Sequence, residues 1–327
     1  MQTIFDGHND TLLRLWQAGD HDGRGFLEGR EGGHVDLKRA REGGLMGGFF
    51  AVFTPDAGPG GGDDDDGGVV DHPPLGPVDP SRARQVAFEV AAILLRMSRA
   101  RPDAIRLCRS VAEIEAAEAA GAVAAVLHVE GAEAIGPDLG ELEVLHAAGL
   151  RSLGPVWSRP NIFGTGVPFR FPADSEEGSG LTEAGERLIR ACDRLGIMVD
   201  LSHMNAAGFR DVAAITTKPL VATHSNAHAL SASSRNLLDW QLAAIAESGG
   251  VVGLNYAVPF LRDDGRRRAD TPLTTLIRHL DHLLERLGES GVALGSDFDG
   301  ALIPREIGDA SGLPALVGAI QIGRAHV

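Results

Sequence analysis

A chain of 327 residues with 43% hydrophobic and 23% charged side chains can bury a large core, and it fits one barrel-sized domain as well as two ordinary ones. Its formal net charge of -15 argues against nucleic acid or an anionic membrane surface as a partner, because both require clustered Lys and Arg. The sequence shows no signal-peptide pattern, no run of about 18 apolar residues and no lipid-anchor motif, so we expect a cytoplasmic protein without a membrane anchor.

Eight short apolar, β-rich runs recur along the chain, and most are continuous rather than alternating. Such runs are typical of parallel strands that are buried on both faces. The predicted strands are residues 3–10, 47–54, 122–131, 150–157, 197–203, 219–225, 249–256 and 291–300. Segments with a helical period separate them, and several of these end on Gly just before the next strand. Strand followed by helix, eight times over, predicts one (β/α)8 barrel domain over residues 1–327 rather than an open sheet.

Two stretches interrupt this alternation. Residues 56–77 consist mainly of Gly, Asp and Pro without an apolar period, which predicts a mobile loop. The Asp63–Asp66 run inside it lacks the alternating ligands and the terminal Glu of a calcium loop. Residues 158–180 follow the fourth predicted strand and are rich in Gly, Pro and aromatic residues. A loop at that end of a barrel would overhang the mouth of an active site.

The end of the chain differs from what a complete barrel needs. A final helix should begin after residue 317 and cover the barrel between the last strand and the first, but the sequence stops soon afterwards. The last six letters, IGRAHV, are also the translation of a common sequencing adapter. We therefore expect a truncated last helix and a non-native tail over residues 321–327, which a second reading of the source DNA would test.

Side chains suited to chemistry gather at the carboxyl ends of the predicted strands, where barrel enzymes place their active sites. His8 and Asp10 would face the same way, because alternate residues of a strand share a face. Taken singly, each such residue is more often a packed histidine, a helix cap or a surface charge. The residues that converge are His8, Asp10, Glu130, His203, His224 and Asp297.

Three imidazoles and three carboxylates in one mouth are costly to bury unless cations pair with them. Nitrogen and carboxylate ligands without thiolate suit Zn2+, with Mn2+, Fe2+ and Co2+ as alternatives. Five protein ligands exceed what one catalytic zinc with an open position accepts, whereas two ions that share a carboxylate can use them all. The residues therefore predict a pair of metal ions.

The motifs at these strand ends resemble those of the membrane dipeptidase (renal dipeptidase) family, peptidase family M19. This family is a branch of the amidohydrolase-type metal-dependent hydrolases, and the chain resembles its bacterial members. The matching motifs, in family order, are DGHND (6–10), HVEGAEAIG (128–136), DLSHMN (200–205), ATHSNAHAL (222–230), SSRN (233–236) and GSDFDG (295–300). Each motif is weak alone, and HxD is shared by many hydrolases, but the set is specific.

The resemblance implies a binuclear zinc site. His8, Asp10 and Glu130 would hold one Zn2+, Glu130 would bridge the two ions, and His203 and His224 would complete the second site. A hydroxide shared by the two ions would be the nucleophile.

The resemblance also implies the substrate and two further roles. Asp297 would take the proton of the attacking water and pass it to the leaving amine. Arg235 would bind the carboxylate of a dipeptide bidentately. The implied activity is the hydrolysis of small dipeptides with an L residue first and an L or D residue second.

One position departs from the family pattern. Mammalian members carry a substrate-contacting His after the fourth strand, whereas this chain has Trp157 there. A Trp cannot perform the charged half of that role, so oxyanion stabilisation would come from the metals, Arg159 or another group. Tyr256, at the end of the seventh predicted strand, would line the substrate pocket or stand on the rim.

Alternatives to a dipeptidase stay open. One is another amidohydrolase reaction on a lactam, lactone or N-acyl substrate, which would use the same metal pair. The other is a barrel that binds metal and peptide without turnover, as a maturation factor. No sequence feature decides between a monomer and a homodimer.

Overall fold

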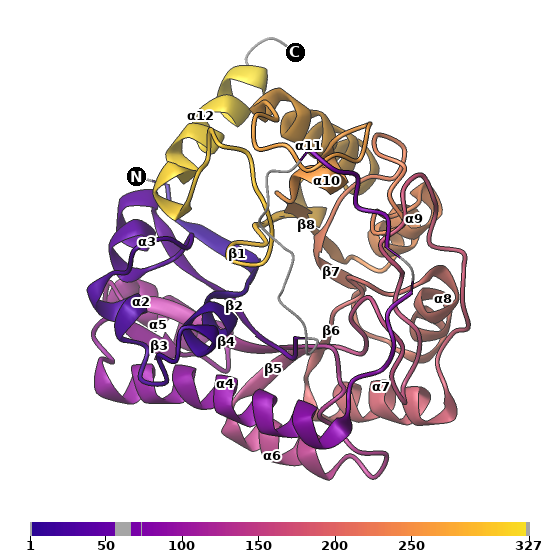
Figure 1. The fold of residues 1–327 in the computed structure, drawn as a ribbon, viewed down its shortest axis with the longest axis horizontal. Coiled ribbons are helices and arrows are strands. Elements are labelled where there is room, and N and C mark those ends of the chain that lie inside the picture. The colour runs from indigo at the N-terminus through magenta and orange to yellow at the C-terminus, as the bar shows by residue number, and fades with distance from the viewer. Residues whose placement is uncertain (1, 56–66, 73, 325–327) are drawn as a thin grey trace.

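The computed structural model describes residues 2–55, 67–72 and 74–324, which form a nearly closed barrel of eight parallel strands surrounded by helices (Figure 1). The strands follow the order β6-β5-β4-β2-β1-β9-β8-β7 around the barrel. They are β1 (Ile4–Asn9), β2 (Leu45–Phe53), β4 (Val123–Glu130), β5 (Leu150–Gly154), β6 (Met198–Val199), β7 (Val221–Ser225), β8 (Val251–Asn255) and β9 (Val292–Gly295). The predicted (β/α)8 barrel is confirmed, and each predicted strand overlaps an observed one, although β6 covers only Met198–Val199 of the predicted 197–203.

The two end strands of the barrel, β6 and β7, meet just after β6. Asp200, directly after β6, forms a parallel bridge with Val221 at the start of β7. The N–H of Leu201 donates to the carbonyl oxygen of Val221 at 2.8 Å. The residues of the DLSH motif that follow β6 therefore lie against β7.

One strand was not predicted. β3 (Ile105–Leu107) pairs in parallel with the first half of β4, before β5 takes over that edge. A run of three residues is too short to show a period that distinguishes a strand from a loop.

Helices cover the outside of the barrel. They are α1 (Thr11–Gln17), α2 (Arg24–Glu28), α3 (Leu37–Gly43), α4 (Pro80–Ala100), α5 (Val111–Ala119), α6 (Gly140–Ala148), α7 (Glu183–Leu195), α8 (Ala206–Ile215), α9 (Asp239–Glu247), α10 (Val258–Leu261), α11 (Leu273–Leu287) and α12 (Leu313–Arg324), with short 3-10 turns at Glu289–Gly291 and Ala310–Gly312. Local signals set their starts: Asp79 accepts the N–H of Arg82 at 2.8 Å, and Pro80 occupies the first turn of α4.

The core explains why the strands are so apolar. All eight residues of β4 are buried, because helices cover the outer face and neighbouring strands fill the barrel interior. Inside the barrel, the backbones approach closely at glycines. A Cβ at Gly253 or Gly295 would collide with the carbonyl oxygen of Thr223. These glycines let β7, β8 and β9 pack tightly around the residue that precedes His224.

A connecting segment crosses the carboxyl ends of the strands. Residues 67–72 return toward α4, and Val69 forms an antiparallel bridge with Arg266 (Figure 1). The N–H of His72 donates to the carbonyl oxygen of Phe169 at 2.8 Å. Half of the loop predicted as mobile, including Asp63–Asp66, lies in residues 56–66, outside the described residues.

The last helix begins earlier than predicted, at Leu313, and packs beside α11 (Figure 1). Residues 325–327 of the predicted tail lie outside the described residues. Among the residues that are described, no helix is both long and apolar enough to cross a lipid bilayer.

Candidate metal centre

Six side chains meet at the carboxyl ends of the barrel strands. They are His8 and Asp10 at β1, Glu130 at β4, His203 after β6, His224 in β7 and Asp297 after β9. Their nitrogen and oxygen atoms form three overlapping groups, and within each group the atoms lie within 4.8 Å of one another. All six residues are buried. The structure therefore brings together the whole set that the strand ends predicted.

One carboxylate oxygen lies at the centre of this cluster. Glu130 Oε1 is 3.0 Å from His203 Nε2 and 3.4 Å from His224 Nε2. The same oxygen is 3.7 Å from His8 Nε2, which is itself 3.4 Å from Asp10 Oδ2. Glu130 thus belongs both to a group on the His8 side and to a group on the His203 side.

Hydrogen bonds around His224 determine which ring nitrogen carries its proton. The Thr223 hydroxyl has one proton and donates it to Asp200 Oδ2 at 2.6 Å, because a carboxylate only accepts. The hydroxyl must then accept from His224 Nδ1, 2.8 Å away. His224 Nε2 keeps an unprotonated lone pair, 3.2 Å from His203 Nε2 and close to Glu130 Oε1.

His203 is oriented in a similar way. Ser158 Oγ lies 2.7 Å from His203 Nδ1, which leaves Nε2 facing the cluster. Burial, together with the positive charges of Arg235 and His8, keeps the pKa values of His203 and His224 well below their ordinary value. Two neutral imidazole nitrogens and a carboxylate oxygen therefore meet at short range, an arrangement that a cation would stabilise.

On the His8 side of the cluster, buried polar atoms would likewise be stabilised by a cation. Both ring nitrogens of His8 and Asp10 Oδ1 are buried without a hydrogen-bond partner, which costs about 1–3 kcal/mol per group. Burial lowers the pKa of His8, but Glu130, Asp10 and Asp297 outweigh it and raise that pKa to about 10. Burial and the neighbouring carboxylates raise the pKa of Glu130 to about 8 and also raise that of Asp297. A buried donor set of imidazole nitrogens and carboxylate oxygens, several of them without a hydrogen-bond partner, fits divalent transition metals.

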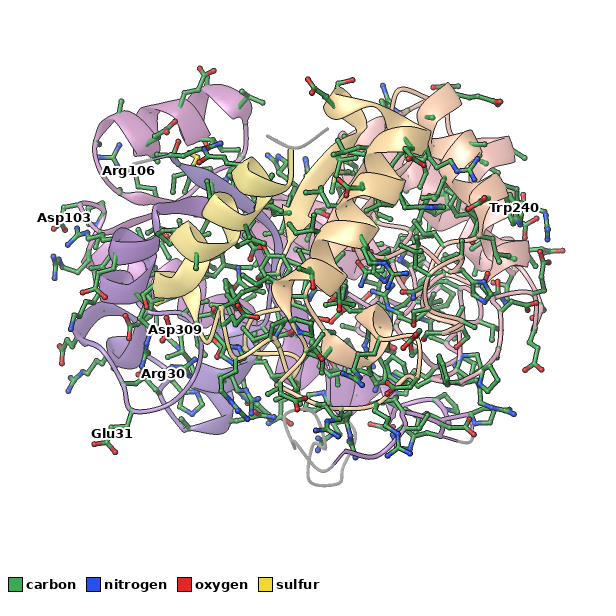
Figure 2. All side chains as sticks on the ribbon, turned by 90° about the horizontal axis from the view of Figure 1, so that it is seen from above. Arg30, Glu31, Asp103, Arg106, Trp240 and Asp309 are labelled. Carbon is green, nitrogen blue, oxygen red and sulfur yellow. The ribbon has the colours of Figure 1, made fainter. Side chains whose placement is uncertain are left out.

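Backbone strain is concentrated at this site. His203, Asp297 and Asp299 have φ angles of 66°, 59° and 67°, in the left-handed region that costs non-glycine residues on the order of 1–3 kcal/mol each. Asn255 Nδ2 donates to Asp297 Oδ2 at 3.0 Å, and Arg30, labelled in Figure 2, donates to Asp299 Oδ2 at 2.7 Å. The surrounding structure thus holds strained residues where the candidate ligands lie.

Comparison with known proteins assigns the family. A statistical description of the membrane dipeptidases, peptidase family M19, matches residues 1–323. The chain belongs to the membrane dipeptidase family. The relationship inferred from the six motifs is therefore confirmed, and with it the use of metal that this family of metallopeptidases implies.

Solved structures of similar chains support the assignment of this M19 family member. A metallopeptidase of family M19 described as dipeptidase AC is 51% identical, with a TM-score of 0.93 over 99% of this chain and 92% of that chain. A metallopeptidase from Rhodobacter sphaeroides, solved with a phosphinate mimic of the dipeptide L-Ala-D-Ala, is 50% identical, with a TM-score of 0.91 over 99% of this chain and 93% of that chain. An uncharacterised protein from the pqqA 5′ region of Klebsiella pneumoniae is 48% identical over 236 residues, which are 72% of this chain and 87% of that protein.

Arg235 of this M19 family member lies beside the cluster rather than on the surface. Its side chain is buried, Nη1 donates to Ser225 Oγ at 2.9 Å, and Nη2 donates to the carbonyl oxygen of His224 at 2.8 Å. These two bonds use two of the five guanidinium N–H groups, and Nε has no protein partner. Arg235 is thus fixed in place and still has donors for an anion.

Trp157 lies next to the cluster, with its ring centroid 5.8 Å from that of His203. Arg159 is fully buried, donates to Glu133 Oε1 at 2.9 Å and to the carbonyl oxygen of Thr54 at 2.6 Å, and stacks 5.1 Å from the Trp157 ring. These contacts make Arg159 a support for Trp157. The suggestion that Arg159 stabilises an oxyanion is therefore not supported.

Tyr256 is buried in this structure. It is 0% exposed and packs edge-on against Phe298, with 5.8 Å between ring centroids. It directly follows β8, which ends at Asn255, the residue that donates to Asp297. That Tyr256 lines the pocket or the rim stays a prediction.

Sequence reasoning missed the residues that orient the candidate ligands. They are Ser158, Asp200, Thr223 and Asn255, each hydrogen-bonded to a cluster residue or to a neighbour of one. All four are directly adjacent to a named residue or lie within a quoted motif. That adjacency was the available signal, but spacing alone does not show which polar neighbour turns inward.

Proposed function

We propose that this protein is a zinc-dependent dipeptidase with two metal ions. In this proposal His8, Asp10 and Glu130 hold one ion, and Glu130, His203 and His224 hold the other. The observation that carries it is Glu130 Oε1, which lies between 3.0 and 3.7 Å from the Nε2 atoms of all three imidazoles. Two bound cations would supply an activated water molecule and polarise the scissile carbonyl.

Asp297 is proposed to move the proton. It shares a group of ligand atoms with His8 and His224, and Asn255 occupies its Oδ2 oxygen. Its Oδ1 oxygen would accept the proton of the attacking water and return it to the nitrogen of the leaving amine. The hydrogen bond from Asn255 keeps the carboxylate turned in one orientation through both transfers.

Arg235 is proposed to bind the carboxylate at the C-terminus of the substrate. Its bonds to Ser225 and to the carbonyl oxygen of His224 hold the guanidinium beside a candidate ligand. The remaining N–H groups can pair with both oxygens of a carboxylate. A free carboxylate fixed at one end limits the site to short peptides whose scissile carbonyl reaches the cluster.

The substrate class proposed is small dipeptides with an L residue first and an L or D residue second. The Rhodobacter sphaeroides metallopeptidase with a phosphinate mimic of L-Ala-D-Ala, at 50% identity, supports this choice.

The test combines metal content with a substrate panel. The protein is stripped with a chelator, reloaded with zinc, and assayed on L-Ala-L-Ala, L-Ala-D-Ala, D-Ala-L-Ala and D-Ala-D-Ala, with metal measured by mass spectrometry. We expect two zinc ions per chain and hydrolysis of the two isomers with an L residue first. Two bound ions without hydrolysis of any isomer would refute the proposal. Turnover of N-acyl amino acids, lactams or lactones alone would replace it with another amidohydrolase activity.

A further inference from the structure

Four aromatic side chains line up beside the metal centre, and we call them the aromatic wall: Phe53, Trp157, Phe169 and Phe260. Consecutive ring centroids are 4.9 Å apart from Phe53 to Trp157, 5.4 Å from Trp157 to Phe169 and 5.8 Å from Phe169 to Phe260. Phe260 is buried, whereas the other three are only partly buried. The wall therefore offers aromatic surface that residues 2–55, 67–72 and 74–324 do not cover completely.

The wall runs from the metal centre to Arg235. The rings of Trp157 and Phe169 lie 5.8 Å and 6.1 Å from the ring of His203. At the other end, Arg235 Cζ lies 5.9 Å from the centroid of Phe260. A molecule that spans the distance from the cluster to Arg235 lies along this wall.

Phe169 is held firmly in the wall by its backbone. The N–H of Arg170 donates to Ser234 Oγ at 3.0 Å, and the N–H of Ser234 donates to the carbonyl oxygen of Arg170 at 3.1 Å. The carbonyl oxygen of Phe169 accepts the N–H of His72 at 2.8 Å. These bonds tie the residues next to Phe169 to the residue before Arg235, so the ring and the guanidinium keep a fixed relation.

The other end of the wall is equally fixed. Arg159 Cζ lies 5.3 Å from the ring centroid of Phe53 and 5.1 Å from that of Trp157. Its ion pair with Glu133 is buried, so the guanidinium cannot move without leaving a charge unpaired. Rigid aromatic surface loses little conformational entropy when a ligand packs on it.

We infer that the aromatic wall, in which Phe169 is the partly buried ring next to Phe260 and Arg235, receives the side chain of the substrate's C-terminal residue and selects dipeptides in which that residue is apolar. This inference rests on the proposed function, in which Arg235 binds the carboxylate of that same residue. A charge-assisted N–H···O pair is ~2.8 Å long, and the Cβ atom of an amino acid is two bonds from its carboxylate carbon. The side chain therefore begins within reach of the rings that flank Arg235.

The chemistry of the wall sets the preference. An apolar side chain on Phe169 and Phe260 is removed from water at a gain of about 25 cal/mol per Å2 of buried area. A carboxylate side chain in the same place loses hydration, and the rings of Phe169 and Phe260 offer it neither positive charge nor a hydrogen-bond donor. Each added methylene in an apolar site is worth roughly 10- to 200-fold in discrimination, so Leu should be favoured over Gly.

The test is a substrate series on zinc-loaded enzyme. kcat/KM is measured for L-Ala-Gly, L-Ala-L-Ala, L-Ala-L-Leu and L-Ala-L-Asp, and for the D forms of the last three, with wild type, Phe169→Ala and Phe169→Leu. Phe88→Ala is the matched control, because Phe88 is a 41% exposed phenylalanine on the outer helix α4. Thermal stability of each variant is recorded in parallel.

We expect wild type and Phe88→Ala to favour Leu over Gly at the second position by about tenfold or more. Phe169→Ala should reduce that ratio at least about fivefold, because the loss falls more on L-Ala-L-Leu than on L-Ala-Gly, and Phe169→Leu should restore most of it. An equal fall on every substrate, which a purely structural role would cause, overturns the inference. So does hydrolysis with no dependence on the second side chain, although the proposed dipeptidase activity would then stand. Failure to cleave any dipeptide overturns both.

Discussion

Replacing Thr223 by valine removes one hydroxyl and leaves the shape of the side chain nearly unchanged. That hydroxyl donates to Asp200 Oδ2 at 2.6 Å and accepts from His224 Nδ1 at 2.8 Å. Asp200 and His224 are both about 1% exposed, so water cannot replace the lost partner. The variant leaves a buried Nδ1–H without an acceptor and no longer fixes the proton of His224 on that nitrogen.

The size of the effect follows from these two broken bonds. Removal of a partner that orients a metal-binding histidine typically lowers metal affinity or activity 10- to 100-fold, which corresponds to about 1.4–2.8 kcal/mol. We expect Thr223→Val to weaken the binding of one of the two zinc ions by that factor, measured by competition with a chelating dye. kcat/KM for L-Ala-D-Ala at limiting zinc should fall in parallel, and excess zinc should restore much of it.

Thr223→Ser is the matched control, because it keeps the hydroxyl and removes only a methyl group. Its zinc affinity should stay within about threefold of wild type, well short of the loss expected when the orienting hydrogen bond is removed. If Thr223→Val binds both ions and has the kcat/KM of wild type, the hydrogen bonds that link Asp200, Thr223 and His224 do not orient the ligand. If both variants lose zinc equally, the effect comes from packing rather than from the hydroxyl.

Three further outcomes follow from individual groups. Glu130→Gln removes the shared anion, so we expect mass spectrometry to find fewer than two zinc ions per chain and activity to fall more than about a hundredfold, beyond the range for residues that only orient a ligand. Gly300→Ala places a Cβ 2.6 Å from Asp297 Oδ1 and still closer to Asp10 Oδ2, so kcat/KM should fall at least about tenfold, and normal kinetics would contradict the close approach. Burial lowers the pKa of His279 from 6.5 to about 4, so between these two pH values the unfolded chain binds a proton that the folded chain does not bind. The contribution of neutral His279 to the free energy of unfolding is therefore complete above pH 6.5. It is lost as the pH falls toward 4, by roughly 2 kcal/mol at pH 5. Urea denaturation should show this loss between pH 8 and pH 5 in wild type, and a flatter dependence in His279→Gln.

Much of the fold could be predicted because the strands of this barrel are buried on both faces. The continuous apolar run of β4 is distinctive, since all eight of its residues are buried. The Gly residues that end α3 and α7 take left-handed φ angles of 73° and 69°, which explains why Gly marked those helix ends. The three residues of β3 carried no such pattern, and their strand exists only because β4 offers a free edge.

The site could be predicted as a set of residues but not as a network. The carboxyl ends of barrel strands converge whichever side chains they carry. The clustering of these six residues could therefore be predicted from their positions at strand ends. Hydrogen-bond partners depend on which way a side chain turns. Ser158 reaches His203 across 45 positions of sequence, and nothing in the spacing of the two residues indicates it.

His203 joins the cluster as predicted, but the backbone that positions it differs from the predicted strand. The sequence suggested a strand through residue 203, whereas β6 ends at Val199 and the chain turns before His203. A left-handed φ of 66° then directs the ring inward. That backbone is unfavourable on its own, so it persists because Ser158 binds Nδ1 and because Val167 donates its N–H to the carbonyl oxygen of His203 at 2.8 Å. The position of this candidate ligand is thus set by the loop after β5. The same loop carries Trp157 and Phe169, so one loop both holds part of the metal centre and carries residues proposed to select the substrate.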